Sequence, residues 1–495
     1  MFANWLWSRL AADYETKILA FDPDDVIARS GLEEKLKSDG FAIIRMDSMD
    51  PIRFRYEYES DYRNRDQKML YLVRSDSTYV PYDLRSQCYE VHLDFASLFP
   101  KLDISVLRRV KSLDLTQLYI ACRNDFGGYR GEEETWRFLN REMYERDNAD
   151  EYAGWLEETI RQRLQEVRHY TDWFEIAKLW ASLRLLQDGG YTQLSMDQLS
   201  VELDTRFQEW MLEHYKKLSA SFHPDSPVLL HKTNDYVRTK GNKLALIVVD
   251  GMSLANWLAF VRADKVSGFS YQWSYAFALI PTITSVSRLA IFSGKLPVEM
   301  SKPFALAQEE KEWQAYWSRS GYKESEIVYQ RGTTGDLPSG VKVVGIVINT
   351  IDDIMHGQMQ GRAGMCRDVV SWSESGELQS LILRLLEKDF RVFITSDHGN
   401  VEAVGQGRPP NEGVLTEMAG QRCRIYRDYA DPASLEQPFR SFLFPPVYLP
   451  KNYQYVLCDD GLSFQPRGKK SVCHGGISLE EVIVPFIQVK GAGSP

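Results

Sequence analysis

The sequence predicts an α/β protein with a doubly wound, mostly parallel sheet in its C-terminal half, preceded by a small α/β domain and a helical region. Two observations predict the C-terminal sheet. Apolar runs typical of parallel strands buried on both faces recur there, namely LALIVV (244–249), VVGIVI (343–348) and RVFITS (391–396). Helix-compatible stretches such as 377–389 separate these runs, and that alternation indicates a doubly wound domain.

The N-terminal part alternates in the same way on a smaller scale. Short apolar runs between polar, helix-compatible stretches predict a small α/β domain over residues 1–105; the runs are KILAF (17–21), FAIIRM (41–46) and KMLYLV (68–73). Residues 106–235 carry apolar side chains at spacings of three and four, most clearly over 155–187, so we expect packed helices there. A stretch rich in Pro, Ser and Asn at 219–243 predicts a linker.

The remaining residues, 236–495, form the predicted C-terminal domain, with a cap-like insertion around 401–470. A chain of 495 residues exceeds what one hydrophobic core organises, which agrees with several domains. Its net charge of -10 argues against a general nucleic-acid coat. Six cysteines without a CxxC pair favour a reduced, cytoplasmic protein. No apolar run reaches the roughly 18 residues that a membrane span needs, so no membrane contact is expected.

Acids follow each of the three C-terminal strands. Asp250 comes directly after the first strand, and Asp397 after the third. Asp352 and Asp353 come shortly after the second strand. Ligands bind at the carboxyl ends of the strands in an open parallel sheet, so we expect these acids along one edge. A single Asp in such a place would be interpreted as a helix cap or turn residue.

Histidines accompany these acids. His356 lies four residues after Asp352. His398 directly follows Asp397, and His474 lies in a CHGG segment near the end of the chain. Each of the three histidines precedes a glycine, which lets the backbone turn tightly. Three carboxylates and three imidazoles form a ligand set that suits two divalent ions, with zinc expected first and manganese as the alternative.

A hydroxyl group suited to nucleophilic attack follows Pro281. Thr284 lies near the predicted start of a helix, where backbone N–H groups and the helix dipole favour a phosphate, and a metal would activate its oxygen. Arg288, one turn further on, is placed to reach a phosphate oxygen. The alternative is that the hydroxyl groups of this stretch only cap the helix; they belong to Thr282, Thr284, Ser285 and Ser287.

The order of these motifs resembles the alkaline-phosphatase superfamily: Asp (250), P-x-x-T (281–284), D-x-x-x-H (352–356), D-H-G (397–399) and H-G-G (474–476). The stretches IVVDGMSLANW, IPTITSVSRLAIFSGKLP, TSDHG and HGGISLEEVIVPFI more closely resemble the PglZ family, which is named from phage growth limitation and occurs in BREX bacteriophage-exclusion systems. The resemblance covers about 240–495. It implies a phosphatase-type core and a metal-dependent phosphoric ester hydrolase.

The resemblance also implies two metal sites and a nucleophile. One site would consist of Asp250, Thr284, Asp397 and His398, and the other of Asp352, His356 and His474. Thr284 would attack the phosphorus, and the phosphothreonine formed would then be hydrolysed. Asp353 remains an alternative ligand to Asp352, and Ser285 remains an alternative nucleophile.

A basic cluster shortly before His474 bears on the substrate. Arg467, Lys469 and Lys470 would place positive charge beside the phosphoryl site, which favours an extended or multiply charged phosphate ester, with DNA or a nucleotide as candidates. The expected function is a phosphodiesterase, and a candidate nuclease; the resemblance to the PglZ family implies that it serves an antiviral BREX system, with other BREX proteins as partners. Two alternatives stay open: a phosphomonoesterase or phosphomutase acting on a small metabolite, and a metal-binding scaffold subunit with little catalysis.

Overall fold

The computed structural model describes residues 1–46, 67–75, 78–125, 127–266, 268–409, 421–427 and 439–491. The chain forms two compact units, Met1–Trp155 and Leu156–Pro495. The domain limits expected at 105 and 235 stay predictions. Parts of the expected insertion, 410–420 and 428–438, lie outside the described residues. No helix within the described ranges is long and apolar enough to cross a membrane.

The first unit contains a four-stranded parallel sheet in the order β2-β3-β1-β4. Its strands are β1 (Lys17–Phe21), β2 (Phe41–Arg45), β3 (Lys68–Val73) and β4 (Tyr89–His92). The helices described in this unit are α1 (Phe2–Arg9), α2 (Val26–Arg29), α3 (Leu32–Ser38), α5 (Tyr82–Arg85), α6 (Phe95–Leu98), α7 (Ile104–Arg109), α8 (Leu115–Arg123) and α9 (Glu132–Asn140). The three apolar runs predicted as strands form β1, β2 and β3, and helices α7 to α9 pack into the same hydrophobic core.

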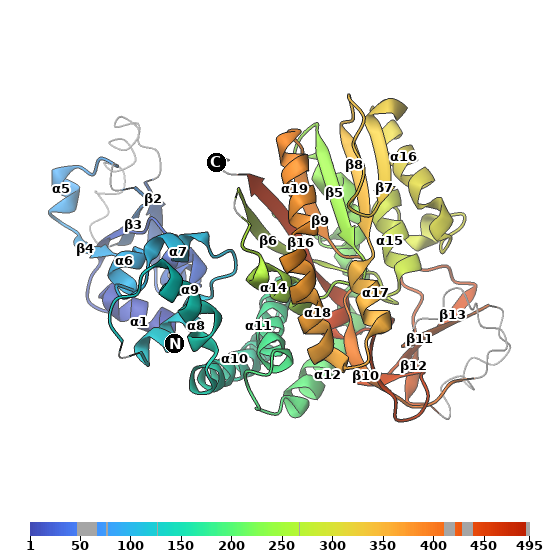
Figure 1. Ribbon diagram of the computed structural model, residues 1–495, viewed down its shortest axis with the longest axis horizontal. Coiled ribbons are helices and arrows are strands. Elements are labelled where there is room, and N and C mark those ends of the chain that lie inside the picture. Colours follow the sequence, from blue (N-terminus) through green and yellow to red (C-terminus); the bar gives the residue numbers. More distant parts are fainter. Residues whose placement is uncertain are drawn as a thin grey trace. The chain divides into compact units, whose positions relative to one another are not determined.

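The second unit is built on a six-stranded sheet in the order β6-β16-β9-β5-β8-β7 (Figure 1). The strands are β5 (Leu244–Val249), β6 (Phe269–Phe277), β7 (Ile327–Arg331), β8 (Val343–Ile348), β9 (Arg391–Thr395) and β16 (Ile483–Gly491). Strands β7, β8, β5 and β9 run parallel, whereas β16 is antiparallel to both of its neighbours. The predicted doubly wound, mostly parallel sheet is confirmed, and the apolar runs form its centre.

Helices cover both faces of this sheet (Figure 1). They are α13 (Thr233–Arg238), α14 (Leu254–Ala263), α15 (Thr284–Ser293), α16 (Glu309–Arg319), α17 (Thr350–Gly357), α18 (Gly361–Ser375) and α19 (Glu377–Glu387). Alternate strand residues such as Ile247 and Ile346 pack with α14, α17, α18 and α19. On the opposite face, a side chain at Gly345 would meet Trp313 of α16 and Phe292 of α15 within 3.0 Å. Glycine there allows these two large rings to lie against the sheet.

The helical region before the sheet contains α10 (Arg146–Glu166), α11 (Tyr170–Asp188) and α12 (Asp197–His214). The periodic stretch 155–187 is interrupted, because the Asp172 carboxylate accepts the backbone N–H groups of Arg168 and His169 at 2.8 Å and starts a new helix. The expected linker at 219–243 contains α13, and Leu229 forms a bridge to Phe277 of β6. This segment is therefore part of the second unit and does not act as an open linker.

The insertion forms two small sheets in its described part. One has the order β14-β10-β15 and the other β11-β13-β12. The strands are β10 (Val401–Gly405), β11 (Cys423–Arg427), β12 (Ser441–Phe444), β13 (Tyr453–Cys458), β14 (Leu462–Ser463) and β15 (Lys470–Cys473). Strand β15 leads directly to His474, and a one-turn helix, α20 (Leu479–Val482), joins that residue to β16.

Candidate active site at the carboxyl edge of the sheet

Asp250, Asp397 and His398 form a compact group at the ends of β5 and β9, which we call the inner group. The two strands are hydrogen-bonded neighbours, so the residues that follow them meet at one edge of the sheet. One ligand atom from each of the three side chains lies within 4.8 Å of the other two. All three side chains are buried.

Backbone hydrogen bonds hold the inner group in place. The N–H groups of Gly251 and His398 both donate to Asp397 Oδ1 at 3.0 Å. Gly251 has a φ of 72°, a conformation that favours glycine, so the chain can turn immediately after Asp250. His398 Nδ1 lies 2.9 Å from the carbonyl oxygen of Gly399, so Nε2 is the nitrogen that faces Asp250.

Asp352, His356 and His474 form a second group, which we call the outer group. Asp352 and His356 lie one turn apart on α17, and His474 follows β15. Their ligand atoms also lie within 4.8 Å of one another. The alternative ligand Asp353 is exposed on the same helix and is not in the group.

The two groups are neighbours. The rings of His398 and His474 stack with centroids 4.1 Å apart. A Cβ atom at Gly251 would lie 3.7 Å from the His398 ring and 3.8 Å from Asp352 Oδ1, so this glycine lies between the groups. The predicted ligands, which are spread over more than 200 residues, therefore meet in one place.

Thr284 lies beside the inner group as the first residue of α15. Its Oγ1 is 3.2 Å from His398 Nε2 and 3.4 Å from Asp250 Oδ1. The hydroxyl groups of this stretch do not cap the helix, because the N-cap residue is Ile283 and no side chain caps it. Thr282 bonds instead to the carbonyl oxygen of Gly476 at 2.9 Å, and Ser287 to the backbone of Leu279. Ser285, the alternative nucleophile, is buried.

Arg288 is buried and pairs with carboxylates. Its guanidinium donates to Asp250 Oδ2 and, at 2.6 Å, to Glu309 Oε1. Burial alone would lower the pKa of Arg288, but Asp250 and Glu309 outweigh it and raise the pKa. The expected contact of Arg288 with substrate stays a prediction, and the observed contact orients Asp250.

Glu309 is a site residue that the sequence analysis missed. It is buried and also accepts hydrogen bonds from Tyr329 at 2.7 Å and Arg331 at 2.9 Å. No local motif surrounds it, so only the tertiary contact with Arg288 identifies it.

The residues present suit divalent metal ions. Among the described side chains, Asp352 Oδ1 and Asp397 Oδ2 are buried without a hydrogen-bond donor, and such oxygens are costly unless a cation binds them. Burial and the neighbouring Asp250 raise the pKa of Asp397, which a cation would reverse. Burial and His398 lower the pKa of His474 to about 4, so its imidazole is neutral and ready to bind a metal. Nitrogen and oxygen ligands of this kind suit zinc or manganese.

The basic residues before His474 are on the surface. Arg467, Lys469 and Lys470 are exposed, and Lys470 Nζ lies 3.5 Å from Glu402 Oε2. Their contact with substrate stays a prediction.

Comparisons with solved structures give low similarity. Murine ectonucleotide pyrophosphatase/phosphodiesterase 5 is 11% identical with a TM-score of 0.37, and the alignment covers 50% of this chain and 87% of that one. Its inactive variant in complex with AMP is 10% identical with a TM-score of 0.36, covering 50% and 88%. Phosphonoacetate hydrolase from Sinorhizobium meliloti 1021, in complex with phosphonoformate, is 11% identical with a TM-score of 0.34, covering 50% and 89%. At these values the likeness has no bearing on substrate.

A search of curated proteins found no match. The family model of the BREX system PglZ alkaline phosphatase-like domain matches residues 228–489, which is more than half of the chain and includes every residue of both groups and Thr284. The chain therefore belongs to the PglZ family of alkaline phosphatase-like domains.

Proposed function

We propose that this protein is a metal-dependent phosphodiesterase that uses Thr284 as its nucleophile. The observation that carries the proposal is the position of the Thr284 hydroxyl, 3.2 Å from His398 in the inner group, whose imidazole stacks on His474 of the outer group. In this arrangement Asp250, Asp397 and His398 would hold one divalent ion, and Asp352, His356 and His474 the other.

The chemistry is a double displacement at phosphorus. When bound, the two divalent ions would lower the pKa of the Thr284 hydroxyl and neutralise the phosphate oxygens in the transition state. Thr284 Oγ1 forms a bond to phosphorus, its proton leaves to solvent, and the bond to the leaving-group oxygen breaks. The leaving group takes up a proton and departs as an alcohol. Water then attacks the phosphothreonine, the bond between phosphorus and Thr284 Oγ1 breaks, Oγ1 regains a proton, and the phosphate product leaves. The N-terminus of α15 orients the phosphate, because its dipole favours an anion there.

The balance of charge favours a diester over a monoester. Two divalent ions would meet three carboxylates, those of Asp250, Asp352 and Asp397. Arg288 and Arg331 share Glu309, so these three side chains add one positive charge, and the Thr284 oxygen offsets it once its proton has left. The site would thus carry a net charge near +1. A phosphodiester has one negative charge and matches that value, whereas a monoester carries close to two at neutral pH.

The biological role in the proposal comes from the family. The matching family model describes a domain of the BREX system, and on this ground we propose that the activity serves antiviral defence beside other BREX proteins. A DNA or nucleotide diester is the proposed substrate class, and the exposed residues Arg467, Lys469 and Lys470 would attract its further phosphates.

The test compares wild type with Thr284→Ala and, as a matched control that keeps a hydroxyl group, Thr284→Ser. Each protein is given bis(p-nitrophenyl) phosphate, p-nitrophenyl phosphate or DNA, with zinc or manganese. We expect the diester to be cleaved fastest, and Thr284→Ala to lower kcat by roughly 10³-fold or more while the metal content stays unchanged. Thr284→Ser should retain measurable turnover.

The other outcomes separate the alternatives. Faster cleavage of the monoester would favour a phosphomonoesterase. Bound metal without turnover of any substrate would favour the scaffold function. Full activity of Thr284→Ala would exclude Thr284 as the nucleophile.

A further inference from the structure

Two adjacent glutamates, Glu480 and Glu481 in α20, are buried just behind the two metal-binding groups. Their side chains are 7% and 0% exposed. A buried carboxylate is costly unless cations or hydrogen-bond donors surround it, so the partners of each glutamate indicate what it holds together.

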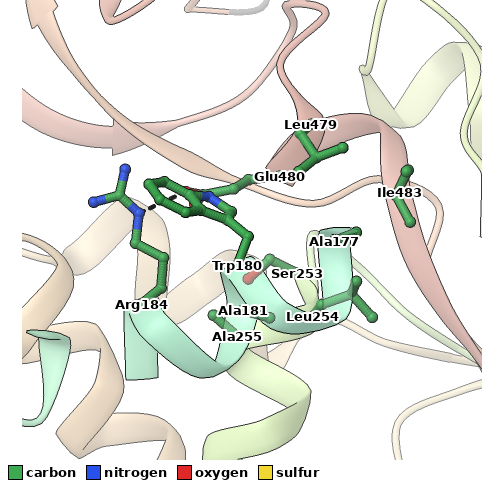
Figure 2. Close-up of a pocket in the computed structure, with 10 residues that line it drawn as sticks. All are labelled: Ala177, Trp180, Ala181, Arg184, Ser253, Leu254, Ala255, Leu479, Glu480 and Ile483. Atoms are coloured by element: carbon green, nitrogen blue, oxygen red, sulfur yellow. Dashed lines mark hydrogen bonds and ion pairs between the residues drawn. The ribbon is translucent and has the colours of Figure 1, made fainter. Parts of the chain in front are cut away.

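The Glu480 side chain points toward Trp180 and Arg184 of α11 (Figure 2). Its Oε1 accepts from Trp180 Nε1 at 2.7 Å and from Arg184 Nε at 2.8 Å, both on α11. Its Oε2 accepts from Arg362 at the start of α18. Burial alone would raise the pKa of Glu480, but Arg362 and Arg184 outweigh it and lower the pKa to about 2.

The backbone of the same residue lies against the inner group. A Cβ atom added to Gly399 would come within 1.9 Å of the carbonyl oxygen of Glu480, so the two backbones are in direct contact. The N–H of Gly399 also donates to the carbonyl oxygen of Glu481 at 2.9 Å. The position of α20 therefore determines where the Asp397–Gly399 turn can lie.

The Glu481 side chain points the other way, to the loop that carries His474. It accepts the backbone N–H of Gly476 at 2.8 Å, the N–H and hydroxyl of Ser478 at 3.1 and 2.6 Å, and the buried guanidinium of Arg422 at 2.5 Å. The Thr282 hydroxyl lies 3.5 Å from Glu481 Oε1. The carbonyl oxygen of Thr282 accepts a hydrogen bond from His474 Nδ1 at 2.9 Å. That bond leaves Nε2 of His474 facing the outer group.

We propose that Glu480 and Glu481 are positioning residues for different metal sites: Glu480 holds the inner group through the Gly399 turn, and Glu481 holds the outer group through the His474 loop. The proposal rests on the two-metal site proposed above. It also gives helices α11 and α18 a role in the chemistry, because they supply the cations that hold Glu480.

The experiment measures the affinity of each site for cobalt(II), by absorbance titration, in Glu480→Gln and Glu481→Gln. His356→Ala and His398→Ala provide reference spectra for the inner and the outer site alone. Loss of a group that orients metal ligands typically lowers affinity about 10- to 100-fold. We expect Glu480→Gln to lower inner-site affinity by that factor with little change at the outer site, and Glu481→Gln to do the reverse.

Two further variants keep the result interpretable. Arg184→Gln removes one of the donors to Glu480 and should weaken the inner site less than Glu480→Gln does. It therefore tests the role of Glu480 even if Glu480→Gln does not fold. Glu312→Gln, which breaks a surface ion pair with Lys295, should leave both affinities unchanged. Thermal melts of the metal-free proteins report folding separately from metal binding.

The outcomes distinguish the two proposals. Wild type that binds fewer than two cobalt ions contradicts the proposed two-metal site itself. Wild type that binds two ions, with both glutamine variants weakening both sites equally or neither site, overturns the assignment of the two glutamates.

Discussion

The inner and outer groups contain similar candidate ligands in different surroundings. In the inner group, Asp250 is 5% exposed at its side chain, and Asp397 and His398 are fully buried. In the outer group, Asp352 is 22% exposed and His356 is 50% exposed. The inner ligands follow central strands of the sheet, whereas two of the three outer ligands lie on a helix that faces solvent.

The two groups also differ in how firmly they are held. Two backbone N–H groups fix Asp397, and Arg288 fixes Asp250. Among the described residues, each group has one carboxylate oxygen without a hydrogen-bond donor, Asp397 Oδ2 and Asp352 Oδ1, but no backbone N–H donates to the Asp352 carboxylate, whose near neighbour is His356 Nε2 at 3.4 Å. We expect a buried, backbone-bound group to be preformed and a half-exposed group to adjust when an ion binds. We therefore expect the inner ion to be retained and the outer ion to exchange.

The largest expected difference between the two groups is the effect of replacing the glycine that follows a histidine, Gly399 in the inner group and Gly357 in the outer group, with alanine. Gly399→Ala would drive a methyl group to within 1.9 Å of a backbone oxygen, whereas a Cβ atom at Gly357 meets nothing within 4 Å. Gly399→Ala should destabilise the protein by about 3 kcal/mol or more and abolish inner-site binding. Gly357→Ala is the matched control and should bind both ions; denaturant unfolding and metal analysis compare the two. A stable, fully metallated Gly399→Ala would contradict the packing described for the inner group.

Truncating one histidine from each group should give the next largest contrast. His398→Ala leaves a cavity in a fully buried place and should lower the free energy of unfolding of the metal-free protein by about 2–4 kcal/mol. His356→Ala, at a half-exposed place, should change it by less than about 0.5 kcal/mol. Each variant should bind one metal ion fewer than the wild type, as measured by elemental analysis. Equal destabilisation by the two variants would show that the groups are not held differently.

The pH dependence of the outer site is a smaller effect. Asp352 raises the pKa of His356 above its usual value of about 6.5. Because its pKa is raised, His356 binds its proton more tightly in the folded protein than in the unfolded chain. The ion pair with Asp352 therefore adds stability below pH 6.5, and this contribution is lost as the pH rises through the raised pKa. A metal must displace that proton, so outer-site affinity should fall as the pH is lowered through the raised pKa, by up to about tenfold per unit. Cobalt titration of His398→Ala between pH 8 and pH 6 measures this, and a flat profile would argue against His356 as a ligand.

The smallest effect is expected for the acid beside Asp352. Asp353 is exposed and lies outside the outer group, so Asp353→Asn should change stability by less than about 0.5 kcal/mol and leave metal binding intact. Asp352→Asn should weaken the outer ion alone. The reverse result would make Asp353 the ligand.

Much of this protein could be predicted from local patterns. Strands β5 and β8 match the predicted apolar runs residue for residue, because a strand buried on both faces needs a continuous apolar segment. Since the carboxyl ends of parallel strands share one edge, Asp250 and Asp397 could be expected to meet. The ligand groups that include Asp352 and His356 were predicted from motif order and spacing, and their roles remain to be tested.

The residues that support these candidate ligands become apparent only in the folded protein. Arg288 pairs with Glu309, 21 residues away, and Arg184 reaches Glu480 across 296 residues. No periodicity or motif links such residues, since an ion pair between distant segments depends on how the helices pack on the sheet. In the structure Ser478 and Glu481 form a capping box at the start of α20, and no local pattern indicates the contacts of Glu481 with Gly476 and Arg422. Local sequence patterns thus predict the candidate ligands and the sheet that gathers them, because these depend on nearby residues, whereas the packing of α11, α16, α18 and α20 sets the contacts that hold each candidate ligand.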